Sequence, residues 1–226
     1  MTPKPSVVVF DVNETLSDLS PLSQRFEGVG LPGALAPTWF ASVLRDGFAL
    51  TATGVNASFA AIGEQVLRQV IHGRPLRVDP DSAVRQVMSA FTGLRIHPDV
   101  EPGVRGLRDA GLRLVTLSNG SVSVGEGLLG RAGLLDRFER LMSVEDAGVW
   151  KPAEQAYRYA AQQCGTDPAQ MVLVAVHPWD IHGAARTGLS TAWINRDGGP
   201  YPSHFERPTW ELGGIDGLVS LLAPPR

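Results

Sequence analysis

The sequence predicts an α/β fold in which a helical segment is inserted after the first strand of a parallel sheet. Three observations predict this class. An unbroken apolar run near the N-terminus is typical of a strand covered on both faces, the region after it has apolar residues at helical spacing, and helix and strand patterns then alternate to the end. Such alternation is typical of a parallel sheet with connecting helices.

The first strand is predicted at Val7–Phe10, where three β-branched residues precede an aromatic one. The stretch from about Ser20 to Arg95 is predicted to be helical, with a break near Pro80. Its apolar residues recur at helical spacing in three groups: Trp39, Phe40, Val43, Leu44 and Phe48; Phe59, Ile62, Val66, Leu67 and Val70; and Val84, Val87, Met88 and Phe91.

The remaining elements alternate after His97. A helix around Val104–Ala110 is expected to stop at Gly111, and a strand over Leu112–Leu117 to end at Ser118. Beyond it we expect a helix near Val122–Ala132, a strand near Arg140–Val144, a helix over Pro152–Cys164, a strand over Met171–Val176, a helix over Ile181–Thr187 and a strand over Thr191–Ile194. The Gly- and Pro-rich segment 196–208 is predicted to be a surface loop.

Composition and charge exclude several classes of protein. With 226 residues, 43% hydrophobic and 19% charged, the chain can bury a large core, which excludes intrinsic disorder as its main state. The formal net charge of -3 favours a small-molecule partner over a nucleic acid. The single cysteine, Cys164, excludes an intramolecular disulfide and favours a reducing cytoplasm, and we expect neither a signal peptide nor a membrane span.

Polar residues that suit catalysis follow the predicted strands at four places in the chain. They are Asp11 with Asn13 and Thr15, Ser118 with Asn119, Lys151, and His177 with Asp180. Because the carboxyl ends of parallel strands share one edge of the sheet, we expect these side chains at one rim. A carboxylate beside a lysine and hydroxyls can serve as a nucleophile, and a second carboxylate can deprotonate a water. Each residue alone is also compatible with a turn or a helix cap, and their shared placement favours a site.

Four ordered segments carry a specific resemblance. They are Phe10-Asp11-Val12-Asn13-Glu14-Thr15-Leu16, Leu117-Ser118-Asn119-Gly120, Trp150-Lys151-Pro152 with Tyr157, and His177-Pro178-Trp179-Asp180 with Gly183-Ala184. Together they resemble the motifs of the haloacid dehalogenase superfamily, above all its type II 2-haloacid dehalogenases. The resemblance implies a Rossmann-like parallel-sheet core, residues 1–16 and 97–226, and a helical cap, residues 17–96, inserted after the first strand.

The resemblance also implies roles for these residues. Asp11 would attack the halogen-bearing α carbon of a short carboxylic acid and form an aspartyl ester, and Asp180 would help to activate the water that hydrolyses it. Thr15, Ser118 and Lys151 would hold Asp11. The residues expected around the substrate and halide are Val12, Phe40, Asn119, Tyr157, Trp179 and His177, with Asn119 on the halide and Tyr157 also supporting Lys151. Neither a metal nor a cofactor is expected, because halide is an adequate leaving group.

Some residues depart from the superfamily's patterns. Its phosphatases have a second Asp at the position of Asn13 and an acidic residue at that of Val176, so a proton donor and two magnesium ligands are missing here. The best-known dehalogenases have an Arg at the position of Phe40, whose ring cannot replace that charge. Arg45 is the candidate substitute, but it lies about 140° around the helix from Phe40, since neighbours are about 100° apart. His177 stands where those enzymes have an Asn, either as a second base near the hydrolytic water or as a partner of a backbone group.

The sequence therefore predicts a cytoplasmic, cofactor-independent dehalogenase of 2-haloalkanoic acids that works through Asp11. Two alternatives stay open: a hydrolase of the same fold acting on another small carboxylate or on a phosphate ester, and a binding protein of this fold without turnover. No nucleic-acid or membrane partner is expected, and the resemblance implies a homodimer.

Overall fold

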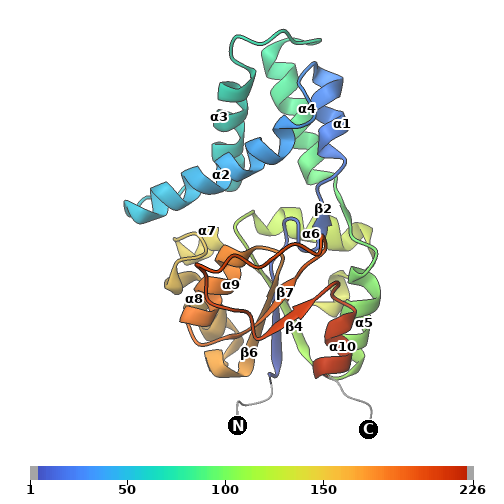
Figure 1. Ribbon diagram of the computed structural model, residues 1–226, viewed down its shortest axis with the longest axis vertical. Coiled ribbons are helices and arrows are strands. Elements are labelled where there is room, and N and C mark those ends of the chain that lie inside the picture. Colours follow the sequence, from blue (N-terminus) through green and yellow to red (C-terminus); the bar gives the residue numbers. More distant parts are fainter. Residues whose placement is uncertain (1–4, 223–226) are drawn as a thin grey trace.

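A six-stranded parallel sheet organises residues 5–222, the part of the chain that the computed structural model describes (Figure 1). The spatial order of its strands is β5 (Arg140–Ser143), β4 (Arg113–Ser118), β1 (Val7–Phe10), β6 (Met171–Ala175), β7 (Ser190–Ile194) and β8 (Trp210–Leu212), and every neighbouring pair is parallel. Because β4 and β6 flank β1 on opposite sides, the strand order reverses at β1. The residues that follow β1 therefore lie at the switch point of the sheet, where α/β proteins place their sites.

Both faces of β1 are buried, which explains its unbroken apolar sequence. Val8 and Phe10 pack on one face in a cluster with residues of α5 (Val100–Asp109), α6 (Val122–Arg131) and α10 (Gly217–Leu222). Val7 and Val9 pack on the other, against α8 (Glu154–Cys164) and α9 (Pro178–Arg186). The short elements α7 (Val144–Ala147), η1 (Leu135–Arg137) and η2 (Pro168–Gln170) lie in the connections. The α/β class predicted from the sequence is confirmed.

Four helices between residues 22 and 92 form a separate layer over the carboxyl edge of the sheet (Figure 1). This helical layer consists of α1 (Leu22–Val29), α2 (Leu35–Ala52), α3 (Phe59–Ile71) and α4 (Pro80–Thr92). Trp39 lies at its centre, fully buried, with its indole N–H donating to the carbonyl of Gly63 at 2.9 Å. The rings of Phe26, Phe59 and Phe91 surround it at centroid distances of 5.8–6.4 Å.

Trp150 joins the helical layer to the sheet. Its backbone N–H donates to the hydroxyl of Thr51 and its indole N–H to the carbonyl of Ala57, both at 3.0 Å. Gly47 of α2 lies directly on the indole, where an added Cβ would come within 2.4 Å of the ring. Glycine is therefore the residue that lets α2 approach this closely.

Several elements differ from the sequence-based predictions. The two-residue strands β2 (Ser17–Asp18) and β3 (Arg95–Ile96), which pair antiparallel where the chain enters and leaves the helical layer, were not predicted, nor were β8 and α10. Helix α9 begins at Pro178, three residues earlier than expected, because proline suits the first turn of a helix. Within residues 5–222 no helix is long and apolar enough to cross a membrane.

Candidate active site

Asp11 lies directly after β1, at the carboxyl edge of the sheet, with only 3% of its surface exposed. One carboxylate oxygen, Oδ1, accepts a hydrogen bond from Lys151 Nζ at 2.9 Å. The other, Oδ2, accepts one from Thr15 Oγ1 at 2.7 Å, and Thr15 Oγ1 in turn accepts from the backbone N–H of Val176 at 3.1 Å. Thr15 thus ties the loop after β1 to the end of β6 and fixes the orientation of the carboxylate.

Lys151 is fully buried between two carboxylates. Its ammonium also donates to Asp180 Oδ2 at 2.5 Å, and Asp180 Oδ1 accepts from the hydroxyl of Tyr157 at 2.6 Å. The sequence-based expectation was that Tyr157 supports the lysine; its hydroxyl instead supports Asp180, because α8 and α9 pack side by side and Tyr157 also reaches the Asp180 carbonyl. Asp11, Lys151, Asp180 and Tyr157 therefore form one continuous buried network.

The charges of this network determine its protonation. Burial raises the pKa of Asp11, but the Lys151 ammonium, His177 and Thr15 lower it more, so the pKa lies well below its ordinary value. Burial lowers the pKa of Lys151, and the charges of Asp11 and Asp180 more than offset this and raise it. Burial raises the pKa of Asp180 against the opposing charge of Lys151. Asp11 is consequently an anion and Lys151 a cation at neutral pH.

His177 makes a second contact to the Asp11 carboxylate. Its Nδ1 lies 3.2 Å from Asp11 Oδ2, and its Nε2 lies 2.8 Å from Glu14 Oε2. Burial lowers the pKa of His177, but the hydrogen bonds and charges of Asp11 and Glu14 raise it to about 9. The imidazole is therefore protonated at neutral pH, and both ring N–H groups donate, one to each carboxylate. The sequence analysis left His177 open between a base and a backbone partner, and the structure places it against carboxylates.

Phe40 and Trp179 enclose the imidazole of His177. The Phe40 ring stacks on it at a centroid distance of 6.3 Å and Trp179 at 4.9 Å. The ammonium of Lys151 lies 5.9 Å from the centroid of the Trp179 ring. Arg45, in contrast, is 66% exposed and pairs with Asp46, so the basic side chain considered as a substitute at the position of Phe40 points to solvent.

Three other predicted residues make contacts that differ from those expected. The side chain of Val12 packs in the core cluster with Phe10, since it lies on the buried side of the loop. Ser118 Oγ accepts from the backbone N–H of Gly120 at 2.9 Å, as in a tight turn, instead of holding Asp11. The Asn119 amide pairs with the Lys151 backbone, accepting from its N–H at 2.9 Å and donating to its carbonyl at 3.2 Å. Asn119 therefore positions the lysine in this structure.

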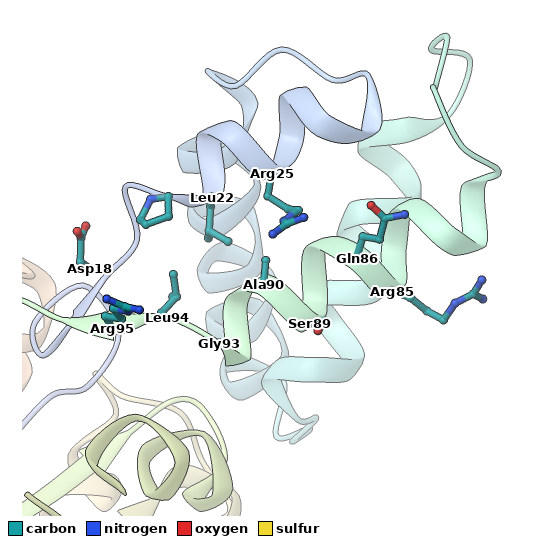
Figure 2. Close-up of a pocket in the computed structure, with 11 residues that line it drawn as sticks. Asp18, Leu22, Arg25, Arg85, Gln86, Ser89, Ala90, Gly93, Leu94 and Arg95 are labelled. Atoms are coloured by element: carbon teal, nitrogen blue, oxygen red, sulfur yellow. The ribbon is translucent and has the colours of Figure 1, made fainter. Parts of the chain in front are cut away.

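Glu14, the partner of His177, lines two cavities, which Asp11 and Lys151 do not line. One of about 170 Å³ extends between Glu14 and Phe40 under the helical layer, and one of about 360 Å³ is lined by Glu14, His177 and Trp193. A larger cavity of about 730 Å³ lies away from Asp11, between α1 and α4 beside β3, and Figure 2 shows Arg25, Gln86 and Ala90 in its wall. Among residues 5–222, no group of three or more His, Cys, Asp or Glu residues is arranged to hold a metal ion.

A family model described as haloacid dehalogenase-like hydrolase matches residues 5–188 of the chain. The chain belongs to the haloacid dehalogenase-like hydrolases. The resemblance expected from the four segments is therefore confirmed.

Individual relatives support this membership. This haloacid dehalogenase-like hydrolase is 30% identical over 218 residues to (S)-2-haloacid dehalogenase of Pseudomonas sp. (strain YL), covering 95% of this chain and 93% of that protein. It is 27% identical to haloacetate dehalogenase H-2 of Moraxella sp. (strain B), covering 97% and 99%. A solved L-2-haloacid dehalogenase structure, 28% identical, matches it with a TM-score of 0.91 over 97% of this chain and 99% of that chain.

Glu14 is the residue of this haloacid dehalogenase-like hydrolase's site that sequence reasoning missed. It lies inside the first motif, but its partner His177 is 163 positions away along the chain. The one local feature that could have indicated a role for Glu14 is its charge beside Thr15, in a segment that is otherwise typical of a turn. No spacing rule relates these two residues.

Proposed function

We propose that this chain is a hydrolytic dehalogenase that displaces halide from the α carbon of a short 2-haloalkanoic acid. The observation that carries the proposal is the state of Asp11, a buried, ionised carboxylate held by Lys151 and Thr15 after the central strand. The relatives that are (S)-2-haloacid and haloacetate dehalogenases support a carbon–halide bond as the target.

In the first step, one Asp11 oxygen forms a bond to the α carbon while the carbon–halide bond breaks and the halide leaves with its electron pair. Lys151 keeps the carboxylate ionised before the attack, and Thr15 fixes its orientation. Such preorientation supplies a large part of the rate enhancement of a displacement. The product of this step is a neutral aspartyl ester and a free halide ion.

In the second step, a water adds to Cγ of the Asp11 ester, and the bond from Cγ to the ester oxygen breaks. The ester oxygen leaves as the hydroxyl of a 2-hydroxy acid, and Asp11 keeps one oxygen from the water. Asp180 holds Lys151 against Asp11 through a contact of 2.5 Å. Its expected help in activating the water stays a prediction.

The small cavity under the helical layer favours a short substrate. The cavity between Glu14 and Phe40 has a volume of about 170 Å³, which corresponds to about six water molecules at about 30 Å³ each. Phe40 lines this cavity with an apolar ring and stacks on the protonated His177, which lies beside Asp11. Two- and three-carbon haloacids fit this description.

We also propose the division into a core, residues 1–16 and 97–226, and a cap, residues 17–96, of which 1–4 and 223–226 lie outside the described residues. Apolar clusters on the two faces of the sheet and a third cluster in the helical layer, which Val144, Trp150 and Ala156 join from the core, support it. A homodimer that acts in the cytoplasm, without nucleic-acid or membrane partners, completes the proposal. An apolar groove of about 580 Å³ along α2 and α3 supports self-association, which analytical ultracentrifugation tests.

Halide release tests the reaction. Purified protein with chelator is incubated with chloroacetate, fluoroacetate and the separate enantiomers of 2-chloropropionate, and halide is measured. We expect release from at least one acid. Release from none of them, together with magnesium-dependent phosphate release from a phosphate ester, contradicts the proposal.

Isotope labelling tests the nucleophile. In a single turnover in heavy-oxygen water, the label should enter Asp11 first and the product only in later turnovers, because water attacks Cγ of the ester. Asp11→Asn should abolish halide release, whereas Asp136→Asn, at a side chain that is 75% exposed, should retain it. Full activity of Asp11→Asn would show that another group attacks the substrate.

A further inference from the structure

Glu14, His177 and Asp11 form a chain of two charge-assisted hydrogen bonds, with His177 in the middle. Glu14 Oε2 lies 2.8 Å from His177 Nε2, and His177 Nδ1 lies 3.2 Å from Asp11 Oδ2. This is the order of groups in which a carboxylate orients an imidazole toward a reacting atom. Here the reacting atom belongs to the carboxylate that becomes the ester in the proposed function, on which the following inference rests.

The backbone at Glu14 is held in an unfavourable conformation. Its φ of 62° makes Glu14 the one non-glycine residue between 5 and 222 with a positive φ. A residue with a Cβ loses about 1–2 kcal/mol in this region, and such strain concentrates at functional sites. The contact with His177 is the side-chain hydrogen bond that Glu14 makes in this conformation.

Two aromatic rings, two carboxylates and one cavity surround His177. Phe40 and Trp179 stack on the ring, and Asp11 lies at one of its nitrogens. The cavity of about 360 Å³ reaches His177 and Glu14 and is large enough for water. The other ionisable groups near the imidazole are Lys151, beyond the Asp11 carboxylate, and Asp18, His97, Arg196 and Asp197, which line the same cavity.

Asp180 is placed less well than His177 to take a proton from water. It is fully buried, and each of its carboxylate oxygens already accepts a hydrogen bond, Oδ1 from Tyr157 at 2.6 Å and Oδ2 from Lys151 at 2.5 Å. Like Asp11 itself, it lines none of the described cavities, whereas His177 lines the one of about 360 Å³. Its contacts suit a group that fixes Lys151.

We propose that His177 is the general base of the ester hydrolysis and that Glu14 is the residue that positions it. Water adds to Cγ of the Asp11 ester as one of its protons moves to His177 Nδ1. The bond from Cγ to the ester oxygen then breaks, and that oxygen takes the proton from Nδ1 and leaves as the product hydroxyl. The regenerated Asp11 carboxyl gives its remaining proton to His177, which restores the starting ion pair.

Formation of the ester itself prepares the base. Before the attack, the negative charge of Asp11 holds a proton on His177, together with Glu14. Alkylation removes that charge, so the pKa of His177 falls and one proton leaves to solvent through the adjoining cavity. The overall reaction releases one proton with each halide, and this is the step at which it departs. The imidazole is thus a cation during the displacement and a base during the hydrolysis.

His177→Gln separates the two steps. In rapid-quench experiments with whichever of chloroacetate, fluoroacetate and the 2-chloropropionate enantiomers the wild type dehalogenates fastest, the wild type should release one halide per site and then continue to turn over. The variant should release the first halide but turn over about 10²–10⁴-fold more slowly, the usual contribution of a general base. The ester should accumulate and be detected by mass spectrometry as an adduct on the Asp11 peptide. His72→Gln, at an exposed residue after α3, should behave as the wild type.

Three results would contradict the inference or the proposed function on which it rests. Turnover of His177→Gln at the wild-type rate overturns the inference. Loss of the first halide in the variant alone also overturns it, since His177 would then act in the displacement. Absence of halide release from the wild type with chloroacetate, fluoroacetate and both enantiomers of 2-chloropropionate refutes the proposed function itself, and the inference with it.

Glu14→Gln provides a second test that does not depend on the folding of the first variant. The amide keeps a hydrogen-bond acceptor at Nε2 but removes the charge that raises the pKa of His177. The rising limb of the pH profile for ester hydrolysis should therefore move to lower pH, and its plateau should fall because the imidazole is a weaker base. An unchanged limb would assign Glu14 a structural role and overturn its part of the inference.

Discussion

The stability of the folded protein should fall as pH rises from 6 to 10, because folded His177 holds its proton more tightly than unfolded His177. Burial lowers its pKa, but Asp11 and Glu14 raise it from 6.5 to about 9. A raised folded-state pKa stabilises the fold fully below the unfolded pKa, and this contribution is lost as pH passes the folded pKa. At about 1.4 kcal/mol per pH unit, the shift from 6.5 to about 9 corresponds to about 3 kcal/mol.

Urea unfolding at pH 6, 8 and 10 measures this loss. The wild type should lose about 3 kcal/mol more than His177→Gln across this range, which shifts its midpoint by about 1 M if the slope is about 3 kcal/mol per M. His72→Gln should follow the wild type. Equal pH dependence in the wild type and His177→Gln would refute the reasoning, since the proton would then not be held by Asp11 and Glu14.

Three further substitutions have outcomes that follow from the contacts. Lys151→Met should abolish halide release and lower the free energy of unfolding by about 3–5 kcal/mol in urea titrations, because it leaves buried carboxylates without a counter-charge. Tyr157→Phe should cost about 2 kcal/mol by calorimetry and reduce kcat, because Asp180 loses a buried donor; an unchanged Tm would exclude this. Gly47→Ala should cost about 1–3 kcal/mol because its Cβ would lie 2.4 Å from the Trp150 ring. The control Gly130→Ala, on an exposed helix position with no atom within 4 Å, should be neutral or stabilising.

The sequence was sufficient to predict the rim on which the site lies. Asp11 follows an unbroken apolar run, and such a run is typical of a central parallel strand, whose carboxyl end is shared with its neighbours. The meeting of Asp11, Lys151 and Asp180 follows from that geometry, and the distances of 2.9 and 2.5 Å agree with it. Patterns of hydrophobicity determine which strand ends come together.

The partners of individual polar side chains could not be predicted in the same way. Asn119 and Ser118 bond to nearby backbone groups, and such choices depend on the local turn instead of the pattern of apolar residues. Glu14 pairs with His177 from a left-handed backbone conformation, which the sequence gives no reason to expect. Strands β2 and β3 are too short, at two residues each, to show a periodicity.

Trp150 makes the position of the helical layer and the position of the nucleophile's counter-ion interdependent. The residue anchored to Thr51 and Ala57 is the immediate neighbour of Lys151 along the chain. Any state in which α2 lifts from the sheet must break these contacts and loosen the peptide that presents the ammonium to Asp11. Docking of the helical layer and placement of the Lys151 ammonium beside Asp11 are therefore linked equilibria, and each favours the other by the same free energy. A conformation in which the helical layer has lifted and water enters the site is thus also one in which Lys151 is poorly placed to pair with Asp11.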